Sequence, residues 1–263
     1  MYEEIKTVLQ RFEPITLREM EGVMLMDRVD TKFIFHVDRY EDLLRQLQPH
    51  YKALVVADTS LTRYETLYYD TDDLQLYHEH HNERANRFKI RSRRYVESDI
   101  CFFEIKYRNH KGRTIKNRIR VPDIEDHITP DPARLLGELT DLDHRRLKGT
   151  LWVHYWRTTL VSKTTTERVT LDVGLHFNTA GKKIDFREVA IAEVKRPKVN
   201  SPSPIVSVLR RHAIRPDGIS KYCLGVAHTH APVRDNNFME LIRALAKISG
   251  RTSTVSAIQP CSG

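Results

Sequence analysis

Three neighbouring segments of this chain alternate charged and apolar residues with a period of two. They are RFKIRSRR from Arg87, FFEIKYR from Phe102 and IKNRIRV from Ile115. Successive side chains of a β-strand point to opposite faces, so each segment is predicted to be a strand with one charged and one apolar face. A short polar stretch with one glycine separates the last two, which is typical of a hairpin. Such adjacent cationic rows need water, carboxylates or a polyanion to offset their repulsion.

Other segments show strand-like or helix-like spacing of apolar residues. Strands are predicted at residues 28–37, 65–71, 151–162, 167–177, 186–197 and 219–227. Helices are predicted within 1–21, at 40–47, 72–83, 132–139 and 201–213, and after Pro232. About eight strands with few helices between them predict an α+β protein that is mainly antiparallel β, built as a closed barrel or as a sandwich of paired sheets.

Charge and cysteine content narrow the class of protein. The 263 residues carry a formal net charge of +8, which favours an acidic partner such as nucleic acid, anionic lipid or a phosphate-rich small molecule. The three cysteines are widely spaced and odd in number; they indicate neither a disulfide framework nor a zinc knuckle, and predict a reducing, cytoplasmic location. We expect no secretory signal and no membrane span. No glycine-rich nucleotide-binding motif occurs, so side chains would have to hold any phosphates.

The cations of the predicted strands have apolar neighbours on both sides and could share one face. They are Lys32, Lys89, Arg91, Arg93, Lys106, Lys116, Arg118, Arg120, Arg168 and Lys195. The carboxylates in the same rows are Asp30, Glu104, Asp172 and Glu193, too few to neutralise them. Facing into a barrel, this surface would form an anion tunnel; facing outward, it would bind nucleic acid. The rows contain almost no aromatic residues for base stacking, which favours phosphate and disfavours a nucleic-acid partner.

Two of the predicted strands contain the same Glu-apolar-Lys triplet, Glu104-Ile-Lys106 and Glu193-Val-Lys195. Each triplet sends a carboxylate and an ammonium group to one face. A hard metal ion could bind the carboxylate while the lysine binds an adjacent phosphate oxygen. A cross-strand ion pair on a solvated sheet is the alternative interpretation of either triplet.

Several motifs resemble a known family. They are DRVDTKFIF, RFKIRSRRY, CFFEIKYRNHKGRTIKNRIRV, YWRTTL, ERVTLDVGL, AIAEVKRP and ISKYCLG. Together they resemble the VTC domain, the polyphosphate polymerase domain of the vacuolar transporter chaperone family, within the triphosphate tunnel metalloenzyme (CYTH-like) superfamily. The resemblance implies a closed eight-stranded β-barrel tunnel with flanking helices over residues 1–231. Residues 232–263 are then expected to form an amphipathic helix and a disordered tail.

The resemblance also implies roles for individual residues. The catalytic contacts to phosphate would come from Lys32, Lys89, Arg91, Arg157, Arg168 and Lys221. Further substrate-binding cations would be Arg93, Lys106, Arg118, Arg120 and Lys195. Glu193 would bind the catalytic Mn²⁺ or Mg²⁺, with Glu104 and Asp172 as further members of the metal shell. ATP would then donate its γ-phosphoryl group to an inorganic polyphosphate chain.

The chain departs from related families at two positions. Where triphosphatase relatives carry Glu-x-Glu-x-Lys, this chain has Arg28-Val-Asp30-Thr-Lys32, with one acid fewer. Gly218 stands where eukaryotic members show a second lysine. Two alternatives to the polymerase stay open: a tunnel triphosphatase acting on tripolyphosphate or a nucleoside triphosphate, and a non-catalytic polyanion-binding module. A membrane or regulatory partner also stays open.

Overall fold

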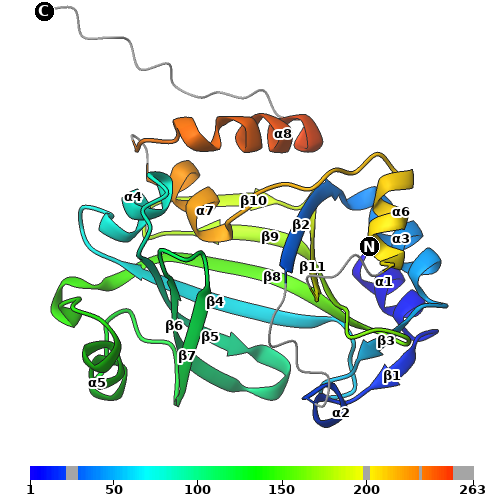
Figure 1. Cartoon of the computed structure of the whole chain (residues 1–263), viewed down its shortest axis with the longest axis horizontal. Helices are drawn as coiled ribbons and strands as arrows, with labels where there is room; N and C mark the ends of the chain where they lie inside the picture. The colour runs from blue at the N-terminus through cyan, green and yellow to red at the C-terminus, as the bar shows by residue number, and fades with distance from the viewer. Residues whose placement is uncertain (22–28, 198–201, 231–232, 251–263) are drawn as a thin grey trace, which may run out of the picture.

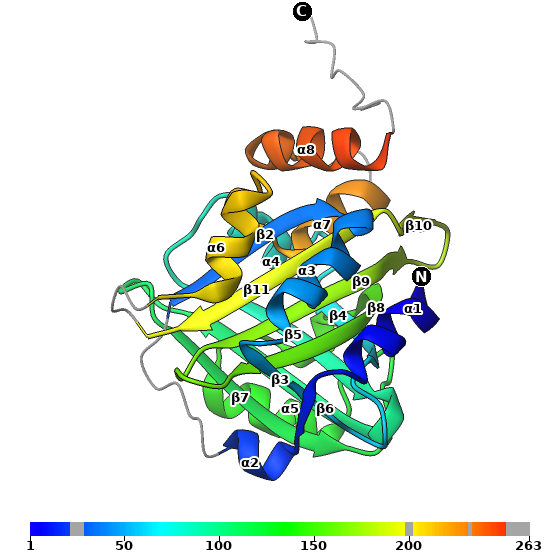
Figure 2. The same ribbon diagram turned by 90° about the vertical axis from the view of Figure 1, so that its right-hand side faces the viewer.

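The computed structural model describes residues 1–21, 29–197, 202–230 and 233–250. A large, mainly antiparallel sheet forms its centre (Figures 1 and 2), with eight strands in the order β2-β11-β9-β8-β4-β5-β6-β7. Their bounds are β2 (Val29–His36), β4 (Thr62–Asp70), β5 (Arg87–Tyr95), β6 (Ile100–Arg108), β7 (Thr114–Val121), β8 (Lys148–Ser162), β9 (Arg168–Asn178) and β11 (Val189–Arg196). Three shorter strands extend the sheet: β1 (Glu13–Ile15), β3 (Tyr51–Leu54) and β10 (Lys183–Phe186).

The predicted α+β class with a mainly antiparallel sheet is confirmed, but closure of the barrel is not. Within the described ranges, β2 and β7 end the path of eight strands, and no strand pairing joins them. The sheet still curves enough for Lys32 of β2 to interact electrostatically with Lys89 of β5 and Lys106 of β6. The β2 end of the path therefore faces β5 and β6 across the curved sheet through its side chains.

Helices cover both faces of the sheet. They are α1 (Tyr2–Leu9), α2 (Leu17–Glu21), α3 (Tyr40–Leu47), α4 (Gln75–His81), α5 (Pro130–Leu139), α6 (Pro204–Arg211), α7 (Lys221–Thr229) and α8 (Met239–Ser249). Helices α1, α3 and α6 pack with Val169, Leu171 and Ala192 on one face (Figure 2). Helices α4, α7 and α8 pack with Leu151 and Phe177 of the other face. Within these described ranges no helix is long and apolar enough to span a membrane.

The three alternating strands that we predicted are β5, β6 and β7, and their register aligns the charged rows. Lys106 of β6 stands opposite Lys89 on one side and Lys116 on the other. Glu104 likewise stands between Arg91 and Arg118. Apolar residues of the opposite face, such as Ile90, Phe103 and Ile105, are buried with residues of α5. Burial of that face fixes the register, because a shift by one residue would bury the charged row instead.

The strand predicted at residues 219–227 is wrong, because these residues lead into helix α7. The Ser220 side chain accepts a hydrogen bond from the Cys223 N–H and caps the helix. Gly225 allows close packing, since a Cβ atom there would collide with Leu151 and Phe177. The Tyr, Val and Cys content of this segment favours a strand, but the cap and the packing against the sheet outweigh that local preference.

The two ends of the chain also refine the predictions. Residues 1–21 form α1, β1 and α2 rather than one helix, because Pro14 pairs in β1 with Ala53 of β3. The amphipathic helix predicted after Pro232 is α8, which buries Leu241, Ile242 and Leu245. The tail predicted to be disordered falls on 251–263, outside the described residues. Division of the chain at residue 231 stays a prediction.

Candidate active site

The alternation of β9 and β11 separates an apolar face from a charged one. Val169 and Leu171 of β9 join the core beneath α3 and α6, so Thr170 and Asp172 lie on the other side of the sheet. Glu193 of β11 pairs with Lys32 of β2 on one side and with Thr170 on the other. We call this side of the sheet, which also carries Arg91 and Glu104 of β5 and β6, the charged face.

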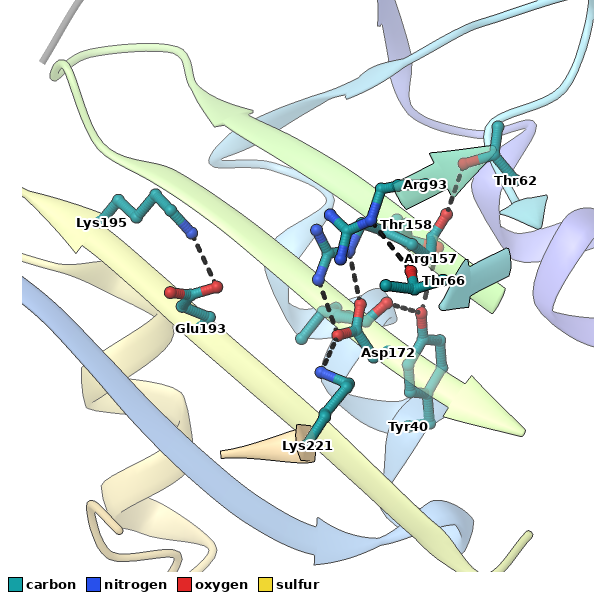
Figure 3. Close-up of polar contacts among 11 residues, drawn as sticks. Tyr40, Thr62, Thr66, Arg93, Arg157, Thr158, Asp172, Glu193, Lys195 and Lys221 are labelled. Atoms are coloured by element: carbon teal, nitrogen blue, oxygen red, sulfur yellow. Dashed lines mark hydrogen bonds and ion pairs between the residues drawn. The ribbon is translucent and has the colours of Figure 1, made fainter. Parts of the chain in front are cut away.

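Asp172 is the centre of the most buried ion cluster on the charged face (Figure 3). Its Oδ1 accepts a hydrogen bond from Arg157 Nε at 2.6 Å, and its Oδ2 accepts from Arg157 Nη2 at 2.8 Å and from Lys221 Nζ at 2.5 Å. Burial alone would raise the pKa of Asp172, but Arg157 and Lys221 outweigh it and lower the pKa to about 2. With 2% of its side chain exposed and both oxygens hydrogen-bonded to cations, Asp172 orients Arg157 and Lys221, and its role as a metal ligand stays a prediction.

Glu104 is held in a similar way on β6. Its Oε2 lies 2.7 Å from Arg91 Nε and 2.6 Å from Arg91 Nη2, and Lys116 Nζ contacts the other carboxylate oxygen. The side chain is 1% exposed. Burial opposes ionisation, but Arg91, Arg93 and Lys116 outweigh it and hold the pKa of Glu104 well below its usual range. Glu104 therefore orients two cations, and its role as a metal ligand, like that of Asp172, stays a prediction.

Glu193 has the most open surroundings of the three predicted metal ligands. Its side chain is 21% exposed, against 1% for Glu104 and 2% for Asp172. Its Oε2 pairs with Lys195 Nζ at 2.8 Å (Figure 3). Burial would raise its pKa, but Lys195 and Lys32 hold the pKa well below the usual range. A Mg²⁺ site often uses one or two carboxylates plus substrate phosphates and water, so Glu193 fits a divalent cation that arrives with phosphate.

The start of α7 gathers lysines from distant strands. Lys32 Nζ of β2 donates to the Ile219 carbonyl at 2.6 Å, and Lys89 Nζ of β5 donates to Ser220 Oγ at 2.9 Å. Lys221, the next residue, reaches Asp172 of β9. Because β2 and β5 lie far apart along the sheet path, residues 219–221 bridge the two walls of the charged face.

Burial and the crowding of like charges lower the pKa of two lysines on the charged face. Water reaches Lys106, yet the surrounding protein and the neighbouring charges of Lys89 and Lys32 lower its pKa to about 7. Burial and the neighbouring Arg91 lower the pKa of Lys116 to about 8, despite its contact with Glu104. An anion bound between these lysines would reverse the shift, since it favours their charged forms.

Tyrosines from β4 and β8 line the charged face, although the charged rows of the predicted strands contain almost no aromatic residues. Tyr64 of β4 and Tyr155 of β8 stack with ring centroids 5.2 Å apart. The Arg157 guanidinium lies 4.9 Å from the Tyr64 ring centroid and 5.1 Å from that of Tyr155, and Arg93 lies 5.4 Å from Tyr64. These rings were not predicted from the sequence, although Tyr155 lies two residues before Arg157 on β8, the spacing of side chains that share one face of a strand.

The predicted site residues separate into a central group and a peripheral one. Glu193 interacts with Lys32, Arg157 and Lys195, and also with Lys106 from the opposite wall. Lys89, Arg91, Arg93 and Lys221 belong to the same face through the contacts above. Arg168 stands opposite Lys195 in the strand register. Arg118 and Arg120 are exposed on β7 at the end of the path, with Arg118 over the Phe102 ring at 4.3 Å.

Three solved structures that are similar to this chain have low sequence identity. A putative adenylate cyclase from Vibrio parahaemolyticus has a TM-score of 0.44 and 11% identity, covering 76% of this chain and 99% of that chain. A putative adenylyl cyclase from Hippeastrum has a TM-score of 0.48 and 15% identity, covering 79% and 98%. One from Bacillus halodurans has a TM-score of 0.46 and 14% identity, covering 74% and 94%.

A comparison with curated proteins found no match. The model of the VTC domain family matches residues 27–230. That range contains all eight strands of the main path, the carboxylates Glu104, Asp172 and Glu193, and Lys221 at the start of α7. The chain therefore belongs to the VTC domain family.

Proposed function

We propose that this protein is a metal-dependent polyphosphate polymerase that transfers the γ-phosphoryl group of ATP to a growing inorganic polyphosphate chain. The observation that carries the proposal is the position of Glu193. It is a partly accessible carboxylate set among Lys32, Lys106 and Lys195 from both walls of the charged face. Lysine and arginine side chains alone would suffice to hold a polyanion. A carboxylate among them weakens anion binding unless a metal ion bridges the carboxylate and the anion.

In the proposed reaction, a terminal oxygen of the chain attacks the γ-phosphorus of ATP. A new P–O bond forms to the chain, the bond between the γ-phosphorus and the bridging oxygen breaks, and its electron pair leaves with ADP. A Mn²⁺ or Mg²⁺ ion bound at Glu193 would neutralise phosphate charge as a Lewis acid. Lys32, Lys89 and Arg91 would bind the phosphates from β2 and β5, and the lysines and arginines would stabilise the charge that develops on the transferred group.

The second half of the charged face would fix the orientation of the substrate. Asp172 binds both Arg157 and Lys221 and so holds the two side chains in place for phosphate. Arg168 and Lys195 would bind phosphates further along the chain, and so would Arg93 and Lys106 on the other wall. The exposed Arg118 and Arg120 of β7 would contact the polyphosphate chain where it leaves the site. Preorganised cations cost little reorganisation during the reaction, which is the usual source of electrostatic catalysis.

Hydrolysis is the competing reaction, because water can attack the same γ-phosphorus. The test is an incubation of the purified protein with ATP and Mn²⁺, with ADP and polyphosphate followed together. We expect long phosphate chains to appear in proportion to ADP. Phosphate release without chains would identify a triphosphatase. Binding of polyphosphate without turnover, steeply salt-dependent and indifferent to metal, would identify a polyanion-binding module.

Substitution of the proposed metal ligand sharpens the test. Glu193→Gln should abolish chain synthesis while the thermal unfolding midpoint stays close to that of the wild type, since the carboxylate is partly exposed. Glu65→Gln is a matched control, because Glu65 follows Tyr64 on β4 and so points to the opposite side of the sheet. Full activity in Glu193→Gln would refute the assignment of the metal site.

A further inference from the structure

Thr170 of β9 has a buried hydroxyl group that no atom of the described residues satisfies. The residue is 5% exposed. Its Oγ1 atom is inaccessible to solvent and has no hydrogen-bond partner among the residues that the structure describes. Buried polar groups are nearly always paired, and each exception needs an explanation. Valine has almost the same shape and would fill the position without an unpaired polar atom.

The strand register places this hydroxyl in the middle of the charged face. Thr170 lies between Arg168 and Asp172 on its own strand and stands opposite Glu193 of β11. Its neighbours along β9, Val169 and Leu171, belong to the core on the other side of the sheet. The Thr170 side chain therefore points to the side where Glu193 lies.

The surroundings define what could satisfy the hydroxyl. The nearest charged pair on β11 is Glu193 with Lys195, at 2.8 Å, and Lys195 stands opposite Arg168 two residues further along the strands. An anion drawn to these cations would offer an acceptor oxygen, and rotation of the Thr170 side chain about χ1 would bring the hydroxyl to it. A hydroxyl donor to a charged oxygen forms a stronger hydrogen bond than one between neutral groups.

We propose that Thr170 is a substrate-binding residue whose hydroxyl donates a hydrogen bond to a phosphate oxygen of a triphosphate bound beside Glu193. This inference rests on the proposed function, since it needs a phosphate chain on the charged face. In the free protein the hydroxyl destabilises the fold slightly, and the bound phosphate provides its partner. Thr170 would thus link the β9 wall to the substrate independently of the metal ion.

The test compares Thr170→Val with Thr170→Ser, using inorganic triphosphate with EDTA as the probe and titration calorimetry as the measurement. Thr170→Val should weaken the affinity at least tenfold, which is about 1.4 kcal/mol. Thr170→Ser, which keeps the hydroxyl, should stay within about threefold of the wild type. In urea unfolding without ligand, Thr170→Val should be as stable as the wild type or more stable, because it removes an unpaired polar group.

The opposite signs of these two effects make the proposal falsifiable. Unchanged triphosphate affinity in Thr170→Val would overturn it. Lower stability of free Thr170→Val would also overturn it, because the hydroxyl would then have a partner in the free protein. If the wild type binds triphosphate neither with EDTA nor with Mn²⁺, the proposed function itself is refuted, and so the two failures are distinguishable.

Discussion

Replacement of Asp172 by asparagine tests whether this carboxylate organises cations or binds metal. The side chain is 2% exposed and binds both Arg157 and Lys221. Lowering of its pKa from 3.8 to about 2 corresponds to about 2–3 kcal/mol of folding free energy at neutral pH. Asparagine also leaves two poorly solvated cations without their anion, and loss of one partner of a buried ion pair typically costs about 3–5 kcal/mol. We therefore expect Asp172→Asn to lower the free energy of unfolding by about 3–5 kcal/mol.

The pH dependence of this loss follows from the direction of the pKa shift. Because the folded-state pKa is depressed, the stabilisation is complete above the unfolded value near 4 and disappears as the pH falls towards 2. Urea unfolding with EDTA should thus show a large difference between wild type and variant at pH 7 and a smaller one at pH 3.

Asp185→Asn is a suitable control, since Asp185 is 32% exposed and lies 3.6 Å from Arg187; such a pair is worth at most about 1 kcal/mol. If Asp172→Asn unfolds within about 1 kcal/mol of the wild type but loses Mn²⁺ affinity, Asp172 is a metal ligand and our reasoning is refuted.

Three other changes test separate parts of the structure. Lys106 has a pKa of about 7, so at pH 8 it is mostly neutral and should take up a proton when triphosphate binds. Lys106→Met should therefore take up fewer protons than the wild type on binding triphosphate at pH 8, measured by calorimetry in two buffers. Equal proton uptake by the two proteins would contradict this. Gly174→Ala should lower the thermal unfolding midpoint and reduce the free energy of unfolding by about 1–3 kcal/mol, because Gly174 has φ +63° and a Cβ atom there would collide with the Tyr2 hydroxyl. An unchanged midpoint would show that Tyr2 moves freely. Tyr222→Phe should lower the free energy of unfolding in urea by about 1–3 kcal/mol, because the Tyr222 hydroxyl donates a hydrogen bond to the fully buried Asp70. An unchanged free energy of unfolding would mean that the three backbone N–H groups that bind Asp70 satisfy its carboxylate alone.

Local periodicity was sufficient to predict the charged wall of β5, β6 and β7. The pattern of two fixes which side chains share a face, and the short RNHKGR loop leaves the second and third strands little choice but to pair. The strands around Arg168 and Glu193 followed from the same rule. Prediction failed at residues 219–227, since the helix there depends on the Ser220 cap and on the packing of Gly225 against Leu151.

The alternation of charged and apolar residues along the strands could not predict which cations bind the three carboxylates. Glu104, Asp172 and Glu193 all occupy strand positions on the charged face, yet two are saturated by cations and one is not. For Asp172 that difference arises from Lys221, which is 49 residues away in sequence. Strand periodicity reports on neighbours two residues apart, whereas this contact depends on where a helix ends up against the sheet.

The sequence alone therefore determined which side chains of each strand share its charged face, the cationic character of the site and the family to which the chain belongs. Only the tertiary structure decided that Glu193 is the most accessible of the three carboxylates and that the start of α7 joins the walls of β2 and β5. It also placed the Thr170 hydroxyl on the side of Glu193 with no hydrogen-bond partner among the described residues. The physical reason is that a side chain's face follows from local backbone geometry, but its partners and its access to water follow from contacts between segments that are distant in sequence.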